Sequence, residues 1–250
     1  MSIELLDPYL VSLKAPSSFA AERYQGLRMT VERLKALRDV RVIAVTSPGA
    51  GDGKTVTSIN LAGALAHGAK ARVLLIDADL RRPTVATRLG LADADPRGTH
   101  LGLADAGSRG LVDAITNEGT RIQDVTRTVD GFHLAVVPAG VTAVPIHELL
   151  RSVRLESILT EARHLYDFVV LDTPPLLPVF DTALLARLVD GVLVVVAANR
   201  TPRKLLGEAL NLLDPAKVLG IVFNGDAKPL FGYYDSAYQR YFQKSMTTHR

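Results

Sequence analysis

Short apolar runs rich in valine, isoleucine and leucine recur along the 250 residues of the chain, and segments with helical periodicity separate them. Runs of this kind indicate strands that are buried on both faces. We predict strands over Arg41–Thr46, Arg72–Asp77, Phe132–Val137, Phe168–Asp172, Gly191–Ala197 and Val218–Asn224. Strands that alternate with helices form right-handed crossovers, so the predicted fold class is α/β, with a parallel sheet and helices on both of its faces.

Helical patterns fill the intervals between the predicted strands. We expect helices over Ala20–Leu37, Lys54–His67, Ile146–Leu165, Asp181–Leu188 and Pro202–Leu213, and a long loop region over Pro83–Leu111. The chain length suits a single large domain. Within it we distinguish an N-terminal segment (residues 1–40), a core (41–225) and a mobile, tyrosine-containing C-terminal tail (226–250).

Composition excludes several classes of protein. Hydrophobic residues make up 48% of the chain, which is enough for a core without covalent staples. There is no cysteine, so a disulfide framework, a thiolate zinc site and a cysteine nucleophile are excluded. The net charge is only +3 and no dense basic run precedes the tail, so nucleic acid is not indicated as a partner. No apolar run is long enough to span a bilayer and no signal peptide is recognisable, so we expect no direct membrane insertion.

A glycine-rich loop joins the first predicted strand to the helix that follows it. Its sequence, SPGAGDGKT, covers residues 47–55. Glycines allow backbone N–H groups to turn onto phosphate oxygens, and the helix N-terminus adds its positive end. Lys54 would reach the β- and γ-phosphates, and Thr55 would place its hydroxyl on Mg²⁺; Pro48 departs from the strict P-loop pattern, which has glycine there. The residues expected to bind a nucleotide are Gly49, Gly51, Asp52, Gly53, Lys54, Thr55 and Val56.

Carboxylates follow two of the other predicted strands. Asp77 and Asp79 leave the end of one strand two residues apart, a spacing that puts both on the same side of an extended chain. Asp172 ends another strand, where an acid typically orients Mg²⁺ or its water. Because ligands bind at the carboxyl ends of parallel strands, these acids should gather beside Lys54 and Thr55. Such a set predicts a site for ATP and Mg²⁺.

Three segments together resemble the bacterial tyrosine kinases of polysaccharide export, which are P-loop autokinases unrelated to eukaryotic protein kinases. They are SPGAGDGKT, LLIDADLRRP at residues 74–83 and VVLDTPP at residues 169–175. The resemblance covers nearly the whole chain, including VPAG at 137–140 and ELL at 148–150. It implies a P-loop NTPase-like form of the α/β fold. It also implies that the last core strand, residues 218–224, brings Asn224 near the adenine.

The same resemblance implies an activity and a role for each site residue. The catalytic residues would be Lys54, Asp77, Asp79 and Asp172, with ATP and Mg²⁺ as cofactors. Asp77 would be the base for a tyrosine hydroxyl, whereas Thr55, Asp79 and Asp172 would belong to the Mg²⁺ network. The implied function is that of a protein-tyrosine autokinase that regulates the synthesis and export of exopolysaccharide or capsule.

The family forms rings in which each kinase domain inserts its tail into the site of a neighbour. The family's ring contact is an E-x-x-R-x-x-R helix, which corresponds here to Glu22 and Arg28, with Gln25 in place of the middle arginine. A solvated charged face is the alternative interpretation of that helix. The implied phosphate acceptors are Tyr233, Tyr234, Tyr238 and Tyr241, four of the seven tyrosines. An aromatic patch that docks the tail on the domain is the alternative for this cluster.

Family members of this length rely on a separate transmembrane activator, the polysaccharide co-polymerase. We therefore expect a cytoplasmic protein held at the inner face of the plasma membrane by a partner. A partitioning or positioning ATPase is an alternative, but it would carry lysine at Gly49 and a basic amphipathic C-terminal helix, neither of which the sequence shows. A weakly active nucleotide-binding regulator of an export complex is favoured by Pro48, Ala50 and Gln25. A purely structural scaffold would not need three carboxylates beside a phosphate loop.

Overall fold

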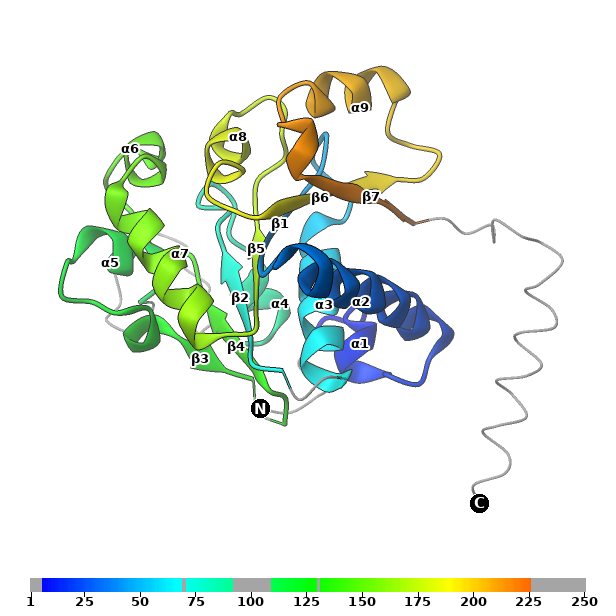
Figure 1. The fold of residues 1–250 in the computed structure, drawn as a ribbon, viewed down its shortest axis with the longest axis horizontal. Helices are drawn as coiled ribbons and strands as arrows, with labels where there is room; N and C mark the ends of the chain where they lie inside the picture. Colours follow the sequence, from blue (N-terminus) through cyan, green and yellow to red (C-terminus); the bar gives the residue numbers. More distant parts are fainter. Residues whose placement is uncertain (1–5, 69–70, 92–108, 130, 226–250) are drawn as a thin grey trace, which may run out of the picture.

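The computed structural model describes residues 6–68, 71–91, 109–129 and 131–225, and in this part of the chain a seven-stranded sheet crosses the molecule (Figure 1). Its strands are β1 (Val42–Thr46), β2 (Val73–Asp77), β3 (Arg127–Thr128), β4 (Leu134–Val137), β5 (Phe168–Asp172), β6 (Gly191–Ala197) and β7 (Val218–Asn224). The strand order is β3-β4-β2-β5-β1-β6-β7. All pairs are parallel except β3 with β4, so the six predicted strands are confirmed and only the short edge strand β3 was not predicted.

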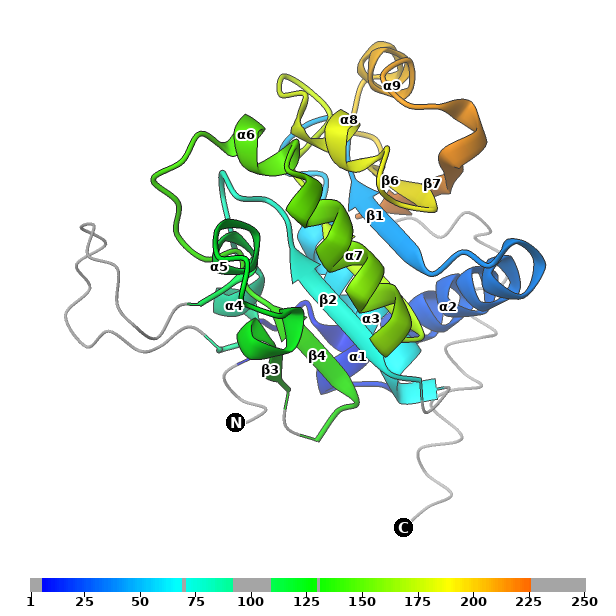
Figure 2. The same cartoon turned by 60° about the vertical axis from the view of Figure 1, so that its left-hand side comes forward.

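Helices connect the strands and lie on both sides of the sheet (Figure 2). They are α1 (Val11–Lys14), α2 (Phe19–Arg38), α3 (Lys54–Gly68), α4 (Val85–Arg88), α5 (Leu111–Thr116), α6 (Ile146–Leu150), α7 (Val153–Leu165), α8 (Asp181–Leu185) and α9 (Arg203–Leu210), with short 3₁₀ helices η2 (Ile122–Val125) and η3 (Pro215–Lys217). Among the described residues, none of these helices combines the length and the apolar character that crossing a membrane requires.

Alternating side chains of each central strand build two apolar cores, one on each face of the sheet. In β1, Val42 and Ala44 belong to the core beneath α5 to α9, whereas Ile43 and Val45 belong to the core beneath α1 to α4. This follows from the pleat of a strand, in which successive side chains point to opposite faces. Every residue of β1, β2 and β5 is buried. The predicted parallel sheet with helices on both faces is therefore confirmed.

The prediction of one continuous helix over Ile146–Leu165 is wrong. The chain forms α6 and α7 instead, separated by Arg151 and Ser152. Ser152 has an extended conformation, and its hydroxyl accepts a hydrogen bond from the backbone N–H of Arg154 at 3.1 Å. This N-cap satisfies a free donor at the start of α7 and sets a new helix axis. The loop predicted over Pro83–Leu111 also contains the single turn α4.

The N-terminal segment packs directly on α3, the helix that leaves the phosphate loop. Asn60 of α3 is fully buried; its Oδ1 accepts a hydrogen bond from Ser12 N at 2.8 Å, and its Nδ2 donates to the Tyr9 carbonyl at 2.9 Å. Nearby, a Cβ on Gly63 would lie 2.8 Å from a methyl group of Leu13. On α3, an amide therefore binds the backbone of the N-terminal segment, and a glycine allows Leu13 to approach closely. The division of the chain at residue 40 stays a prediction.

Replacing Asn60 with alanine should lower the free energy of unfolding by about 1 to 3 kcal/mol, because it leaves the buried N–H of Ser12 without a partner and removes the hydrogen bond to the Tyr9 carbonyl. Urea denaturation of both proteins measures the difference. The matched control is Asn211→Ala at the exposed end of α9, which should change stability by less than about 0.5 kcal/mol. An equal loss in the two variants would contradict the role assigned to Asn60.

Candidate active site

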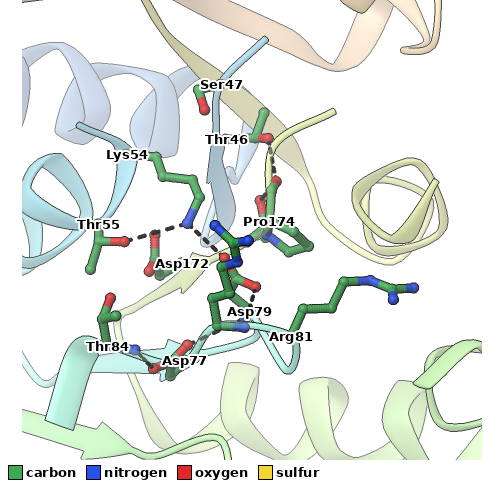
Figure 3. A network of polar contacts seen from close by, with 12 residues as sticks. Thr46, Ser47, Lys54, Thr55, Asp77, Asp79, Arg81, Thr84, Asp172 and Pro174 are labelled. Atoms are coloured by element: carbon green, nitrogen blue, oxygen red, sulfur yellow. Dashed lines mark hydrogen bonds and ion pairs between the residues drawn. The ribbon is translucent and has the colours of Figure 1, made fainter. Parts of the chain in front are cut away.

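The ends of three neighbouring strands bring the predicted site residues to one edge of the sheet. β5 lies between β1 and β2, and the register pairs Asp77 of β2 with Asp172 of β5. Residues 47–53 leave β1 at this same edge and enter α3. The side chains that Figure 3 shows together there are Lys54, Thr55, Asp77, Asp79 and Asp172.

Two glycines of the phosphate loop adopt backbone conformations that other residues rarely adopt. Gly51 and Gly53 have φ angles of +87° and +92°, in the left-handed region that favours glycine. A Cβ on Gly53 would lie 1.9 Å from Nδ2 of Asn224. This Nδ2 donates a hydrogen bond to the carbonyl of Asp52 at 2.9 Å, so the last residue of β7 holds the loop directly. The predicted proximity of Asn224 to the adenine stays a prediction.

The carboxylate of Asp52 is buried and connects the phosphate loop to the segment between β6 and α9. Its Oδ2 accepts a hydrogen bond from Gly49 N at 3.2 Å, and its Oδ1 accepts one from Thr201 Oγ1 at 2.6 Å. Arg200 donates to the Gly51 carbonyl at 3.0 Å. Sequence reasoning missed Arg200 and Thr201 because no motif surrounds them. The available signal was an acid inside a glycine-rich loop, which needs a partner when it is buried.

Lys54 forms an ion pair within the site. Its Nζ lies 2.8 Å from Oδ2 of Asp79 and 3.4 Å from Oγ1 of Thr55 (Figure 3). The Lys54 and Asp79 side chains are only 13% and 5% exposed, so the pair is shielded from water. Phosphate oxygens of a nucleotide would compete with Asp79 for this ammonium group.

Asp172 is fully buried and only half satisfied. Its Oδ1 accepts a hydrogen bond from Ser58 Oγ at 3.0 Å, whereas its Oδ2 has no hydrogen-bond partner in the described part of the chain. Burial raises the pKa of Asp172, against the opposing effects of the Lys54 charge and of the Thr55 and Ser58 hydroxyls. Sequence reasoning missed Ser58, one helical turn after Lys54. A buried carboxylate oxygen without a partner is costly, and a bound cation would remove that cost.

This donor set fits a magnesium ion. Mg²⁺ prefers oxygen ligands and is usually held by one or two carboxylates together with phosphates and water. The unpaired Oδ2 of Asp172 and the hydroxyl of Thr55 are of this kind, and Asp79 supplies a second carboxylate. Within the described residues, no group of three or more His, Cys, Asp or Glu side chains is arranged to hold a metal by itself.

Asp77 is buried beneath the turn that follows β2. Its Oδ2 accepts hydrogen bonds from the N–H groups of Thr84 and Val85, both at 3.0 Å, and its Oδ1 accepts one from Asp79 N at 3.3 Å. Burial, followed by the charge of Asp172, raises the pKa of Asp77 to about 7. β2 ends at Asp77, so Asp79 lies in the turn. The extended spacing expected for the two acids is not kept, and their carboxylates contact different partners.

The other predicted site residues lie outside this cluster. Val56 is in the first turn of α3, where its carbonyl accepts a hydrogen bond from Asn60 Nδ2 at 2.9 Å. On α2, Glu22 is exposed and Arg28 Nε lies 3.5 Å from Oε1 of Glu32 on the same helix. The four predicted acceptors, Tyr233, Tyr234, Tyr238 and Tyr241, lie outside the described residues. The roles of all these residues stay predictions.

The raised pKa of Asp77 predicts a pH dependence of stability in the chain without nucleotide or metal. A carboxyl group whose pKa is about 7 when folded and 3.8 ordinarily binds its proton more tightly in the folded state. Its contribution to stability is therefore full at low pH and is lost as the pH rises through about 7. Between pH 5 and pH 8 we expect the free energy of unfolding to fall by roughly 2 to 3 kcal/mol, because each pKa unit corresponds to about 1.4 kcal/mol.

Urea denaturation in the presence of EDTA at the two pH values tests this expectation. The variant Asp77→Asn should show a much smaller fall, with the remainder due to Asp172, whose pKa is raised in the same direction. The control Asp214→Asn alters an exposed acid at the start of η3 and should keep the full pH dependence. A fall that is the same size in Asp77→Asn as in the parent chain would show that Asp77 does not titrate in this range.

Comparison with known proteins identifies the family to which this chain is similar. The model of a family described as an AAA domain matches residues 40–213. Tyrosine-protein kinase YwqD of Bacillus subtilis is 31% identical over 230 residues, which cover 90% of each chain. Succinoglycan biosynthesis transport protein ExoP of Rhizobium meliloti is 33% identical over 225 residues; these cover 86% of this chain and only 26% of ExoP.

A solved structure has the same architecture. The kinase domain of the Escherichia coli tyrosine kinase ETK superposes with a TM-score of 0.76 at 24% identity, over 92% of this chain and 85% of that one. At this identity the similarity demonstrates the fold alone. The family follows from the match over residues 40–213 and from the extent of the similarity to YwqD. The chain therefore belongs to the bacterial tyrosine kinases, whose kinase domain is a P-loop AAA domain.

Proposed function

We propose that the chain is an ATP- and Mg²⁺-dependent autokinase that phosphorylates the tyrosine cluster of its own C-terminal tail, in a neighbouring copy within a ring. The observation that carries the proposal is the gathering of a lysine, a hydroxyl and three acids at one sheet edge: Lys54, Thr55, Asp77, Asp79 and Asp172. Phosphoryl transfer depends mainly on positioning and on electrostatic stabilisation, and these groups are suited to supply both.

Lys54 stands at the start of α3, where backbone N–H groups and the positive end of the helix favour phosphate. In the structure its ammonium group is paired with Asp79. Phosphates of bound ATP would draw Lys54 away and leave Asp79 and Thr55 free as ligands. Mg²⁺ held by Thr55, Asp79 and Asp172 would neutralise the charge that develops during transfer.

Asp77 is proposed as the base that accepts the proton of the tyrosine hydroxyl as its oxygen attacks the γ-phosphorus. A carboxylate has about four acceptor positions, and backbone N–H groups of Asp79, Thr84 and Val85 use three of them. A pKa of about 7 is close to the pH at which a general base is most effective. Because the side chain is only 1% exposed, the acceptor tyrosine has to enter the site rather than approach over the surface.

The tail is the proposed acceptor because four of the seven tyrosines lie within residues 233–241. Each phosphate would add roughly −1.5 to −2 charges, so several together would repel one another and drive the ring apart. The proposed ring contact includes Glu22 and Arg28 of α2. Gln25 replaces an arginine in that contact and removes one charge from it.

We assign the biological process from the names of the relatives. One is called a succinoglycan biosynthesis transport protein, and the chain spans 26% of it. We propose that this chain regulates the synthesis and export of an exopolysaccharide or capsule. In this proposal it is cytoplasmic and is held at the inner face of the plasma membrane by a transmembrane activator of the co-polymerase type.

Two other functions are distinguished by particular residues. A weakly active nucleotide-binding regulator is favoured by Pro48 and Ala50, which depart from the usual phosphate loop, and by Gln25. A partitioning ATPase is disfavoured by Gly49, which stands where that class carries lysine. Neither the regulator nor the partitioning ATPase transfers phosphate to a tyrosine, so mapping phosphotyrosine distinguishes both of them from the autokinase.

The test is to incubate the purified chain with ATP and Mg²⁺, with and without a cytoplasmic fragment of a co-polymerase activator, and to map phosphotyrosine by mass spectrometry. We expect phosphate on one or more tyrosines of residues 233–241. Lys54→Met should abolish labelling, since it removes the phosphate ligand. Asp77→Asn should reduce its rate by about 100-fold or more, the usual contribution of a general base.

Two surface substitutions serve as controls, Lys204→Met on α9 and Asp214→Asn at η3, and both should label like the parent chain. No phosphate on the tail, even with the activator present, would overturn the autokinase proposal and leave the nucleotide-binding regulator. Normal labelling of Asp77→Asn would show that another group accepts the proton.

A further inference from the structure

The start of α8 is hydrogen-bonded to the loops that follow two of the motif strands, β2 and β5, and the loop after β5 is bonded in turn to the end of β1. We propose that Asp181 and Thr182, the first two residues of α8, are positioning residues that hold the acids of the active site in place. The inference rests on the proposed kinase function and adds to it two residues that no motif marks. It is built on the hydrogen bonds of α8 to the loops after β2 and β5, and on the hydrogen bond that joins the loop after β5 to Thr46 at the end of β1.

Asp181 binds the loop after β2 through a two-point ion pair. Its carboxylate accepts hydrogen bonds from Arg81 Nε at 2.6 Å and from an Arg81 terminal nitrogen at 3.0 Å. The Asp181 side chain is 6% exposed, and that of Arg81 is 45% exposed. Two parallel hydrogen bonds define orientation as well as distance. Arg81 is therefore held in a fixed position relative to α8.

Arg81 lies within a turn that both acids of the motif close. Oδ1 of Asp79 accepts a hydrogen bond from Arg82 N at 3.1 Å, and Oδ2 of Asp77 accepts those of Thr84 and Val85. The other oxygen of Asp79 contacts Lys54. A shift of the turn would therefore move the Asp79 carboxylate relative to Lys54. The ion pair with Asp181 opposes such a shift.

Thr182 is linked to the other two motif strands through a single carbonyl group. The carbonyl of Pro174, two residues after Asp172, accepts hydrogen bonds from Thr182 Oγ1 at 2.6 Å and from Thr46 Oγ1 at 2.9 Å (Figure 3 shows the contact of Thr46). Both threonines are fully buried. Thr46 is the last residue of β1, immediately before the phosphate loop. One carbonyl thus joins the end of β1, the loop after β5 and the start of α8.

A purely structural role for Asp181 predicts something different. An acid at the first position of a helix interacts favourably with the helix dipole, and its loss would lower stability without changing how the site binds ligands. A positioning role acts through Arg81. Loss of either partner should then change the site in the same way, and loss of both should add little. This difference can be measured without phosphoryl transfer.

The experiment measures the Mn²⁺ concentration that gives half-maximal binding of a fluorescent ATP analogue to the full chain. Asp181→Asn and Arg81→Gln should each raise that concentration by about 10- to 100-fold, the usual effect of losing a group that orients metal ligands. The double variant should resemble the more affected single variant. Thr182→Val should also raise it, whereas Thr182→Ser, which keeps the hydroxyl, should restore most of the parent behaviour.

The matched control is Asp214→Asn, because Asp214 caps η3 and has no contact with the site; its Mn²⁺ requirement should stay within about twofold of the parent. An unchanged Mn²⁺ requirement in Asp181→Asn, or additive effects in the double variant, would overturn the inference. If Asp181→Asn fails to fold, Arg81→Gln alone carries the same test, because Arg81 is partly exposed. A parent chain that binds the analogue but labels no tyrosine would overturn the kinase proposal and leave this result standing.

Discussion

The site depends on two carboxylates that the sheet forces together. Asp77 and Asp172 end adjacent parallel strands at paired positions, and both are buried. Like charges in a medium of low dielectric constant repel strongly, so the two acids are not ionised together without a cation nearby. The pKa of Asp77 is raised first by its burial and then by the charge of Asp172. The lysine at the start of α3 and, in the proposed reaction, a metal ion are the charges that make the arrangement tolerable.

The phosphate loop and the acids of the site are held in place by hydrogen bonds from different parts of the fold. On the side of the phosphate loop, Thr201 and Asn224 hold Asp52 and its neighbours through the β6–α9 connection and β7. On the side of the acids, Arg81 joins the turn after β2 to α8. Since the two sets of contacts involve separate segments, substitutions on one side should alter phosphate binding and those on the other should alter the placement of the acids. Lys54 is the residue that spans both sides.

Much of this arrangement could be predicted from local sequence, because a parallel sheet brings the carboxyl ends of its strands to one edge. The motif residues Lys54, Asp77 and Asp172 are found together for that reason alone. Long-range partners such as Thr201 and Asp181 could not be predicted, because their hydrogen bonds join segments about 100 residues apart or more and no local pattern records them. Helix ends were missed where a single side chain decides them, as Ser152 does between α6 and α7.

Because α3 contacts two parts of the molecule at once, its sequence is constrained at its first residue and again near its middle. Lys54 begins the helix at the phosphate site, and Asn60 and Gly63 contact the N-terminal segment about two turns later. Six residues of helix separate Lys54 from Asn60, a distance of about 9 Å along a rigid rod. A side chain at Gly63 would require Leu13 to shift or to be replaced by a smaller residue. We therefore expect these two positions to co-vary among relatives, independently of any change in catalysis.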